Sequence, residues 1–518
     1  MILGRNLGEP PSPQAMSGGH ATIDDLFSRA VARRPDAIAL SDPPNRESFT
    51  EGAPRSITYA QADLIITAIA ARLRKLGLAT DAVVAIQLPN TIESVLTILG
   101  VLRAGMIATP VPLLWRKADC VVALSRIGAR AIVTTSRVNG FDHSDLAMHV
   151  AADIFPVRHI GGFGKTLADG VIPFDELLFG GTPETLEPPV REFNPAAHTA
   201  IVTWDSTPDG LIAVARNHNE LIGAGLGVML EGRIGQDCSI LSASALSSLA
   251  GLGTALMPWL LSGGTLSLHQ PFDGETFARQ CEETCCDTVV LPGPLAHRLL
   301  EAGLLSNPEL LNVLAVWRSP ERFETGNQWR HPLIELTDVV AFGEVGLIPL
   351  RRAAGGLPES IPEGDVTVPR AAAGASLVCE TARNDAGTLA LRGPMVPQHA
   401  FPPGAERGIA PHLKVALSGF VDTGYPCRID QELSAVVITG PVPNMVTVGA
   451  YRFVRHELEE LVGKVASDAT LAALPDRYSG HRLAGHVKDH AALQAALAER
   501  GINPLVAGAF RDRNQKTG

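Results

Sequence analysis

The chain has 518 residues, of which 46% are hydrophobic and 19% charged, so it is expected to be globular and long enough for more than one domain. The formal net charge of -11, with no basic run interleaved with aromatic residues, argues against a nucleic-acid partner. The seven cysteines are irregularly spaced, which suits free thiols in a reducing compartment and favours a cytoplasmic protein.

Helical and strand patterns alternate from about residue 22 onward. Residues 1–20 are rich in Gly and Pro and lack an apolar segment, which predicts a flexible tail rather than a signal peptide. The next segments predict a helix with Thr22 as N-cap, a strand at 83–88, a helix from Thr91 that ends at Gly105, and strands at 107–111 and 131–134. This order is typical of parallel sheets covered by helices.

The uncharged stretch 239–268 does not predict a membrane span. Ser, Gly and Pro258 interrupt it, and it divides into a helix-like half and a strand-like half, so a buried core segment is expected. Downstream, Cys281, Cys285 and Cys286 cluster in the sequence. Adjacent Cys285 and Cys286 cannot easily face one ion, and no second Cys/His pair follows, so the spacing does not favour zinc.

A turn-rich segment at 418–430 separates a large part of the chain from a smaller C-terminal part. The smaller part begins with a short strand-rich stretch, which is followed by a helical pattern from Arg455 to Leu461. The predicted division is therefore a flexible tail at 1–20, a large α/β domain at 21–428 and a small α+β domain at 429–518.

Five segments, in this order, resemble the motifs of one enzyme superfamily. They are Ile57-Thr58-Tyr59-Ala60, Leu88-Pro89-Asn90-Thr91-Ile92-Glu93, Gly387-Thr388-Leu389, Asp422-Thr423-Gly424 and Leu474-Pro475-Asp476. Over about residues 20–510 the chain resembles the adenylate-forming superfamily of acyl-CoA synthetases, nonribosomal peptide adenylation domains and luciferases. The resemblance implies an acyl-CoA synthetase-like α/β fold, with parallel-rich sheets sandwiched by helices in a large N-terminal domain and a small C-terminal α+β lid.

The resemblance also implies a reaction. A carboxylic acid attacks the α-phosphate of ATP to give an acyl-adenylate, and the thiol of coenzyme A or of a carrier-protein pantetheine then takes the acyl group. This chemistry needs positive charge and backbone N–H groups around the phosphates, together with a carboxylate for magnesium. ATP or AMP, Mg²⁺ and coenzyme A are expected only where this activity is retained. The other expected partners are a small carboxylic acid or acyl ligand and a protein.

Residues 201–214 stand where the superfamily has its phosphate-binding loop. Aligned without gaps, they keep only Thr207 and Val214 of that signature, and the loop lysine becomes Ile212. The glycines that let backbone approach phosphate are replaced by larger residues, namely Ser206, Asp209 and Ala213.

Other substitutions change the charge and shape of the same loop. Pro208 removes an N–H donor. Asp205 and Asp209 are expected to add negative charge beside an anionic ligand, at roughly 1 to 4 kcal/mol for one like charge at ~4 Å. The alternative is that Asp205, Pro208, Asp209 and Gly210 form an ordinary polar turn.

The superfamily's magnesium motif corresponds to residues 342–346. Gly346 takes the place of the metal-binding Glu, and Gly343 is retained as an expected nucleotide contact. Glu344 lies two positions before Gly346 and could supply a metal ligand; the alternative is a solvated or hydrogen-bonded loop carboxylate.

Three residues near the predicted domain boundary match the superfamily's nucleotide site. Asp422 stands where the ribose hydroxyls are held, Arg428 where a guanidinium contacts the nucleotide, and Asp430 where the hinge between the domains pivots. The catalytic lysine of the lid corresponds to Ala509. His218, retained at a helix start, is expected to be structural rather than catalytic.

Losses at four separated motifs predict an acyl-CoA synthetase-like protein of the AMP-dependent synthetase/ligase family whose adenylation chemistry is lost or strongly weakened. Whether it is an enzyme stays open at this point. Such a protein would bind an acyl, aryl or nucleotide-type ligand, or a partner enzyme. The alternatives are a divergent but active carboxylate–CoA ligase and a protein that performs only the thioester-forming half-reaction.

Overall fold

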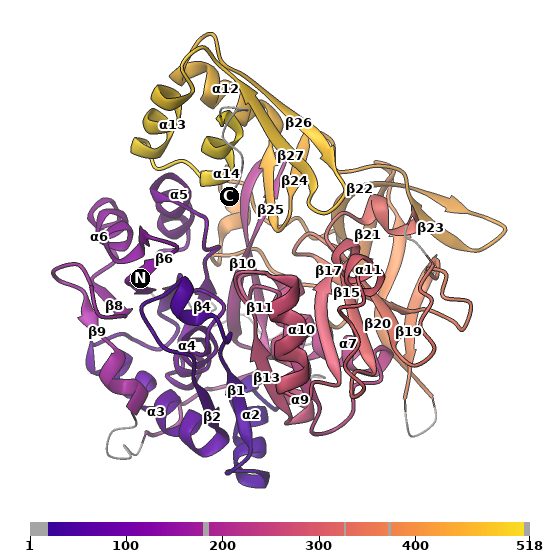
Figure 1. The fold of residues 1–518 in the computed structure, drawn as a ribbon, viewed down its shortest axis with the longest axis horizontal. Coiled ribbons are helices and arrows are strands. Elements are labelled where there is room, and N and C mark those ends of the chain that lie inside the picture. The colour runs from indigo at the N-terminus through magenta and orange to yellow at the C-terminus, as the bar shows by residue number, and fades with distance from the viewer. Residues whose placement is uncertain (1–18, 180–185, 326–327, 371–373, 512–518) are drawn as a thin grey trace.

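The computed structural model describes residues 19–179, 186–325, 328–370 and 374–511 (Figure 1). The tail predicted at 1–20 therefore lies almost entirely outside the described residues. The largest sheet has eight strands. In spatial order they are β17 (Gly346–Arg351), β16 (Glu335–Phe342), β15 (Asn312–Trp317), β14 (Thr288–Pro292), β12 (Ser239–Ser242), β13 (Thr265–Leu268), β1 (Ile38–Ser41) and β2 (Ser56–Thr58).

A second sheet of seven strands faces the first. Its order is β11 (Gly210–Asn217), β10 (Thr199–Thr207), β4 (Ile107–Pro110), β3 (Val83–Ile86), β5 (Ala131–Thr135), β8 (His159–Phe163) and β9 (Ile172–Pro173). Its inner strands pair in parallel, as do β12 to β16 in the first sheet. The predicted parallel-rich α/β fold is confirmed.

Helices fill three layers around these two sheets. Between the sheets lie α2 (Ile23–Arg33), α3 (Tyr59–Lys75), α4 (Ile92–Arg103), α7 (His218–Glu231) and α9 (Met257–Ser262), which share one core with both inner faces. The outer face of the seven-stranded sheet is covered by α5 (Lys117–Arg126) and α6 (His143–Asp153). The outer face of the eight-stranded sheet is covered by α10 (Gly274–Glu283) and α11 (Gly293–Glu301).

Local sequence explains how these elements are placed. In β3, Val84 and Ile86 face the central core while Val83 and Ala85 face the outer one, because successive strand side chains point to opposite faces. Thr22 caps α2 as predicted, accepting a hydrogen bond from the Asp25 amide within a capping box. The uncharged stretch 239–268 is core, as predicted. No helix among the described residues is both long enough and apolar enough to cross a membrane.

A third sheet of six antiparallel strands lies beside the two larger ones. Its order is β18 (Ile361–Pro362), β23 (Ala435–Ile438), β22 (Val421–Asp430), β21 (Thr388–Arg392), β20 (Ala375–Arg383) and β19 (Gly364–Pro369). The predicted boundary at 428 falls inside β22, which is paired on both sides. The division at that position stays a prediction.

The C-terminal residues form a fourth sheet with helices on one side. The strands are β25 (Tyr451–Val454), β24 (Met445–Val448), β27 (Gly480–His486) and β26 (Thr470–Asp476), and the helices are α12 (Arg455–Val465), α13 (His490–Glu499) and α14 (Pro504–Ala507). This part has its own core around Leu458, Val462, Leu497 and Phe510. In Figure 1 it caps the end of the molecule where the two large sheets meet.

Candidate functional site

The residues aligned with a phosphate loop form a tight β-hairpin. Strands β10 and β11 pair from Thr199 and Asn217 to Thr207 and Gly210, so that only a two-residue turn separates them. Thr207 donates its hydroxyl proton to the Gly210 carbonyl at 2.8 Å. A loop that grips phosphate must present several backbone N–H groups to the ligand. Here the backbone of the segment is paired with itself almost to the tip.

Asp205 is not part of the turn, and the expectation that it would be was wrong. Its side chain is buried in β10, where Oδ1 accepts a hydrogen bond from Nη1 of Arg452 at 2.5 Å. Its Oδ2 accepts from the Glu344 amide at 2.9 Å. The negative charge expected to repel a phosphate is therefore neutralised by a cation from β25. Asp209, which does lie in the turn, is exposed and pairs with Lys414 at 2.9 Å.

Ile212 lies directly opposite Asp205 on β11 and is buried in the central core. Cross-strand partners in an antiparallel pair project from the same face of the sheet. The position that carries a lysine in the superfamily thus lies beside a carboxylate that is already paired. Val214, the other retained residue of the signature, is buried in the same core.

The turn between β16 and β17 approaches the ion pair from the other side. Gly343 has φ +55, and a Cβ atom there would lie 2.2 Å from Asp205 Oδ2 and 2.8 Å from Arg452 Nη1. The ion pair therefore occupies the space into which a side chain at 343 would project. At Gly346 a Cβ would lie 2.9 Å from Cδ1 of Leu391, so a carboxylate at this position would have to displace core atoms.

Glu344 is buried, and of the expected alternatives, a solvated or a hydrogen-bonded loop carboxylate, the structure shows the hydrogen-bonded one. Its Oε2 accepts a hydrogen bond from the Leu249 amide at 2.7 Å. Burial raises the pKa of Glu344 to about 7, and the charge of Asp205 acts in the same direction, whereas Arg216 opposes them. The described residues contain no group of three or more His, Cys, Asp or Glu side chains that could hold a metal ion. The side chains around Gly346 do not fit a magnesium–triphosphate site.

Arg216 also binds the turn between β16 and β17. It is fully buried and donates hydrogen bonds to the carbonyls of Glu344, Val345 and Met395, the last two at 3.2 and 3.4 Å. Burial lowers the pKa of this guanidinium. The turn at 343–345 is thus fixed by Asp205 on one side and Arg216 on the other, which leaves it little freedom to rearrange around a ligand.

An aromatic ring packs against the cation of the ion pair. Tyr425 replaces the final Asp of the superfamily's Asp-Thr-Gly-Asp motif and is almost fully buried. Its ring meets the edge of Phe342 at 5.6 Å between centroids and lies 5.7 Å from the Arg452 guanidinium carbon. Such a ring face favours the cation. Sequence reasoning identified neither Arg452 nor Tyr425 as a site residue.

The C-terminal part touches the large body at several further points. The Tyr451 hydroxyl accepts from the Leu114 amide at 3.0 Å. The Gly501 carbonyl accepts from the Ala118 amide at 3.2 Å. The Asp476 carbonyl accepts from Arg322, and the Arg298 guanidinium lies 5.0 Å from the Tyr478 ring centroid. These contacts join the C-terminal part to α5, to α11 and to the segments that follow β4 and β15 in the large body.

The retained nucleotide-type residues lie apart from this buried cluster. Asp422 and Arg428 are exposed on the same face of β22. Asp422 accepts hydrogen bonds from the Thr388 hydroxyl at 2.7 Å and the Gly424 amide at 2.9 Å. Arg428 lies 3.4 Å from Asp430, whose pKa is lowered mainly by the hydrogen bond from the Leu433 amide. Their contact with a nucleotide, and the hinge role of Asp430, stay predictions.

The other two predicted positions have structural surroundings. Ala509 lies in the short helical turn Gly508–Phe510 and packs against the C-terminal core. His218 begins α7, and its Nδ1 accepts a hydrogen bond from the Ile23 amide at 3.1 Å, which ties α7 to α2. Burial lowers the pKa of His218 to about 3, so it is neutral at physiological pH. This geometry fits the structural role predicted for His218.

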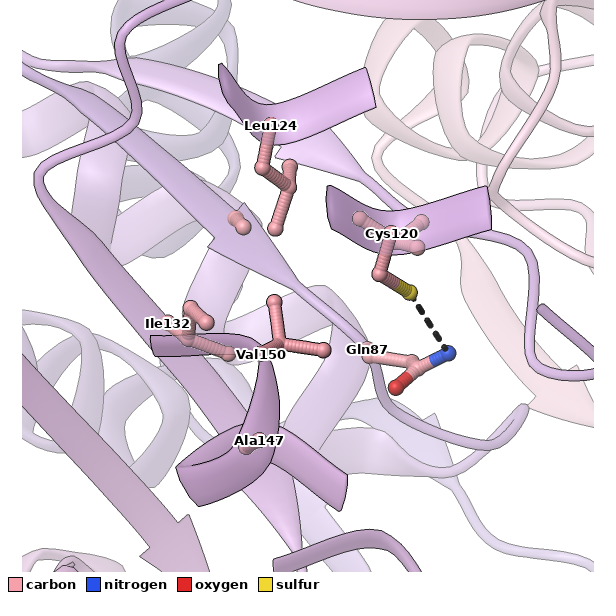
Figure 2. A pocket seen from close by; sticks show the side chains of 8 residues that line it. Gln87, Cys120, Leu124, Ile132, Ala147 and Val150 are labelled. Atoms are coloured by element: carbon pink, nitrogen blue, oxygen red, sulfur yellow. Dashed lines mark hydrogen bonds between the residues drawn. The ribbon is translucent and has the colours of Figure 1, made fainter. Parts of the chain in front are cut away.

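Two small cavities lie near the seven-stranded sheet. Figure 2 shows the first, behind β3 and β5, where Nε2 of Gln87 faces Sγ of Cys120 at 3.9 Å. Its volume is about 10 Å³, too small to hold a water molecule securely. The second, of about 40 Å³, lies between Pro89, Asn90 and the segment 245–247. Neither cavity is large enough for a small-molecule ligand, since sites for such molecules are far larger.

Comparison with known proteins identifies relatives of this fold. The model of the family described as "AMP-binding enzyme" matches residues 27–322. Salicyl-AMP ligase / salicyl-S-ArCP synthetase of Mycobacterium tuberculosis is 30% identical over 141 residues, covering 27% of this chain and 24% of that protein. Long-chain fatty acid transport protein 1 of Homo sapiens is 26% identical over 298 residues, covering 55% and 42% respectively. The chain thus matches less than half the length of either relative.

Solved structures extend the likeness to nearly the whole chain. The amide bond synthetase McbA from Marinactinospora thermotolerans superposes with a TM-score of 0.68 at 18% identity, over 94% of each chain. Apo MbtA from Mycobacterium smegmatis superposes with a TM-score of 0.63 at 21% identity, over 96% of this chain and 93% of that one. At these identities the likeness shows a shared fold.

Proposed function

The chain belongs to the AMP-binding enzyme family, and from this premise we propose that it is a member that has lost the adenylation reaction and keeps the fold in a closed, ion-paired form. The observation that carries the proposal is the buried contact between Arg452 and Asp205. If the resemblance holds at this position, the phosphates of ATP would lie beside β10, where this chain has its own salt bridge. The Asp205 carboxylate thus takes the place of a phosphate as the anion at this position, and Arg452 is its cation.

The surroundings of the ion pair support the same conclusion. The hairpin turn is too short to wrap a triphosphate, the buried Ile212 replaces the loop cation, and Gly346 offers no side-chain carboxylate to magnesium. Adenylation requires charge stabilisation at the transferring phosphate, and the parts that supply it act as a unit. Loss of one part weakens such an enzyme, and loss of all of them removes the basis for the reaction.

A ligand-binding role remains compatible with the proposal. Asp422 and Arg428 offer a carboxylate and a guanidinium on one exposed strand face, a pairing suited to a sugar hydroxyl and an anion. The names of the relatives point to acyl or aryl carboxylates as the class of acid that family members handle. We therefore propose weak binding of a nucleoside monophosphate at β22, without turnover.

The proposal is tested by acid-dependent exchange of pyrophosphate into ATP, measured on highly purified protein with aromatic, short-chain and long-chain carboxylic acids. The expected result is no exchange above the acid-free background for any of them. A working salicylate or fatty-acid ligase, assayed in parallel, shows that the assay detects turnover. Robust exchange with a single acid would overturn the proposal and favour the divergent, active ligase.

A further inference from the structure

The last turn of α10 ends in a specific hydrogen-bonded cap. The Cys286 amide donates to the Cys281 carbonyl at 3.0 Å, and the Cys285 amide donates to the Glu282 carbonyl at 3.1 Å. Cys285 has φ +46, in the left-handed region. These two bonds and this backbone angle define a Schellman motif, in which the side chains at the two ends of the six-residue segment come into contact. In this chain the two ends are both cysteines.

The two thiols meet in a fixed geometry. Sγ of Cys281 lies 2.7 Å from Sγ of Cys286, and both residues are free cysteines buried in the core beneath α10. The disulfide bond length is about 2.05 Å, so a small approach would join them. The Asn307 amide nitrogen donates to both carbonyls, at 3.0 and 3.1 Å, and lies 3.4 Å from the Cys281 sulfur. Asn307 thereby holds the two cysteines together.

The two thiols differ in how readily they lose a proton. The hydrogen bond from the Cys286 thiol lowers the pKa of Cys281, and the contact from Asn307 acts in the same direction against burial. The same bond, together with burial, raises the pKa of Cys286. The thiolate is the reactive form of cysteine, which makes Cys281 the nucleophile and Cys286 the proton-bearing partner.

The helix end offers a route for a small oxidant. Cys285, Glu282 and Glu283 are exposed, so the last turn of α10 lies at the surface although the two sulfurs face inward. A left-handed backbone at a residue other than glycine is unfavourable, which lowers the cost of opening this turn. Local opening of a helix end is among the least costly motions of a folded protein.

We propose that Cys281 and Cys286 form a reversible oxidation site that takes a small peroxide and closes to an intrachain disulfide. Cys281 first gives up its thiol proton, and the thiolate attacks one peroxide oxygen, so that the O–O bond breaks and a sulfenic acid and hydroxide form. The hydroxide takes up the proton released by Cys281 and becomes a first water. The Cys286 sulfur then attacks the sulfenic sulfur, the S–O bond breaks, and the hydroxide leaves with the Cys286 proton as a second water. In total, two thiols and one hydrogen peroxide give one disulfide and two waters, and an added dithiol reverses the step. This site is independent of the proposed loss of adenylation.

The test treats the full-length protein with hydrogen peroxide and then maps its thiols by differential alkylation and mass spectrometry. Unreacted thiols are blocked with one reagent, the protein is reduced with dithiothreitol, and the released thiols are labelled with an isotopically heavier form. The expected result is heavy label on Cys281 and Cys286 and light label on Cys285, with all three light when dithiothreitol is applied before blocking. Peptides that contain Cys238 should carry light label throughout, since its sulfur contacts a serine hydroxyl instead of a second thiol.

Variants make the assignment specific. Cys285→Ser should form the disulfide as the wild type does, whereas Cys286→Ser should leave a sulfenic acid on Cys281 that reacts with dimedone. Cys238→Ser is the matched control for a buried cysteine and should leave the labelling unchanged. If Cys286→Ser does not fold, the labelling of the wild type and of Cys285→Ser still decides the matter. Light label on Cys281 at peroxide exposures that fully oxidise Cys285, or a disulfide that includes Cys285, would overturn the proposal.

Discussion

Arg452 Nη1 lies 2.5 Å from Asp205 Oδ1, and the two residues are 247 positions apart in the chain. Their side chains are 12% and 7% exposed, so the contact is largely withdrawn from water. Asp205 belongs to the hairpin that replaces a phosphate loop, and Arg452 belongs to the C-terminal sheet. The pair therefore fixes the C-terminal sheet against the strand where a nucleotide would be expected.

The first prediction concerns the removal of one partner of this pair. Arg452→Met should lower the free energy of unfolding by about 3–5 kcal/mol, because it leaves the buried Asp205 carboxylate without a counter-charge. Lys414→Met is the matched control, since Lys414 pairs with Asp209 at the exposed surface and its loss should cost no more than about 1 kcal/mol. Urea unfolding followed by tryptophan fluorescence measures both values.

The same experiment has a second arm. Replacing both partners, as Asp205→Asn with Arg452→Met, should regain much of the loss because no bare charge remains. If Arg452→Met is no more destabilising than Lys414→Met, the ion pair is not buried in solution. In that case the closed form inferred for the C-terminal sheet is wrong.

A second prediction concerns the loop lysine. Ile212→Lys alone should not create pyrophosphate exchange, because Gly346 and the two-residue turn remain. Ile212 is buried opposite Asp205, so the new ammonium would compete with Arg452 for a carboxylate and not face open space. We expect a stability loss of roughly 1–3 kcal/mol from the buried, imperfectly paired charge. Exchange activity from this single change would show that the rest of the site was never impaired.

The third prediction concerns pH. Burial raises the folded-state pKa of Glu344 to about 7 from its ordinary value of 4.5, so the folded protein holds this proton more tightly than the unfolded chain does. The stabilising contribution is therefore complete below about pH 4.5 and is lost as the pH rises toward 7. Relative to Glu344→Gln, the wild type should lose roughly 1–3 kcal/mol of stability between pH 5 and 8. Urea titrations of both proteins across that range measure the difference.

The comparison with Glu344→Gln is needed because other groups also make the stability depend on pH in this range. His218 has a pKa lowered by burial to about 3, so it opposes Glu344 by destabilising the fold as the pH falls below its unfolded value. This contribution is common to both proteins and cancels in the difference. A difference that stays constant from pH 5 to 8 would show that Glu344 is ionised in the folded protein throughout.

The fourth prediction concerns nucleotide binding. AMP should bind at least as well as Mg-ATP, with a Kd of about 0.1–1 mM, or roughly 4 to 5.5 kcal/mol. Repulsion of the phosphates by Asp205 is not the reason for this preference, because Arg452 neutralises that carboxylate. Instead, added phosphates find no lysine at Ile212 and no magnesium ligand at Gly346. Isothermal titration calorimetry compares the two nucleotides directly.

The variant Asp422→Ala should abolish AMP binding with little effect on folding, because the side chain is exposed. Asp365→Ala, an exposed carboxylate on another strand of the same sheet, is the matched control and should bind AMP as the wild type does. Tighter binding of Mg-ATP, or AMP binding that survives Asp422→Ala, would place the nucleotide elsewhere or remove the proposal that β22 binds it.

Local patterns in the sequence were sufficient to predict parallel sheets covered by helices, whereas the acyl-CoA synthetase-like arrangement of the fold was predicted from the family resemblance. Thr22 as a cap, Gly105 as a helix end and a buried strand at 83–88 are each determined by neighbouring residues, and the structure contains all three, with the strand ending at Ile86. Parallel pairing followed from the strand–helix alternation. Such features could be predicted because capping, turns and side-chain periodicity act over a few residues.

The candidate site could be predicted only in part, because its central contact joins distant segments. No local pattern connects Asp205 with Arg452. The available signal was Asp205 itself, a carboxylate directly after the strand-like run Ile201-Val202-Thr203-Trp204, because a charge that continues a buried strand rarely lacks a partner. Pro208 and Gly210 suggested a turn that includes Asp205, whereas the observed turn consists of residues 208 and 209 only. The burial of Glu344 was likewise invisible, since Leu249 and Arg216 approach it from other elements.

The C-terminal sheet contacts three separate parts of the large body: Asp205 on β10, Leu114 in the segment after β4, and Arg322 in the short helix Pro320–Thr325 that follows β15. The C-terminal sheet is therefore expected to be fixed to the large body and not to move as a separate lid. A protein fastened in this way should melt in a single transition, with the C-terminal helices losing their amide protection together with the central sheets. Cutting the chain within the 439–444 connection would not release a stable large fragment, because the fragment would keep Asp205 in its interior after its cation had gone.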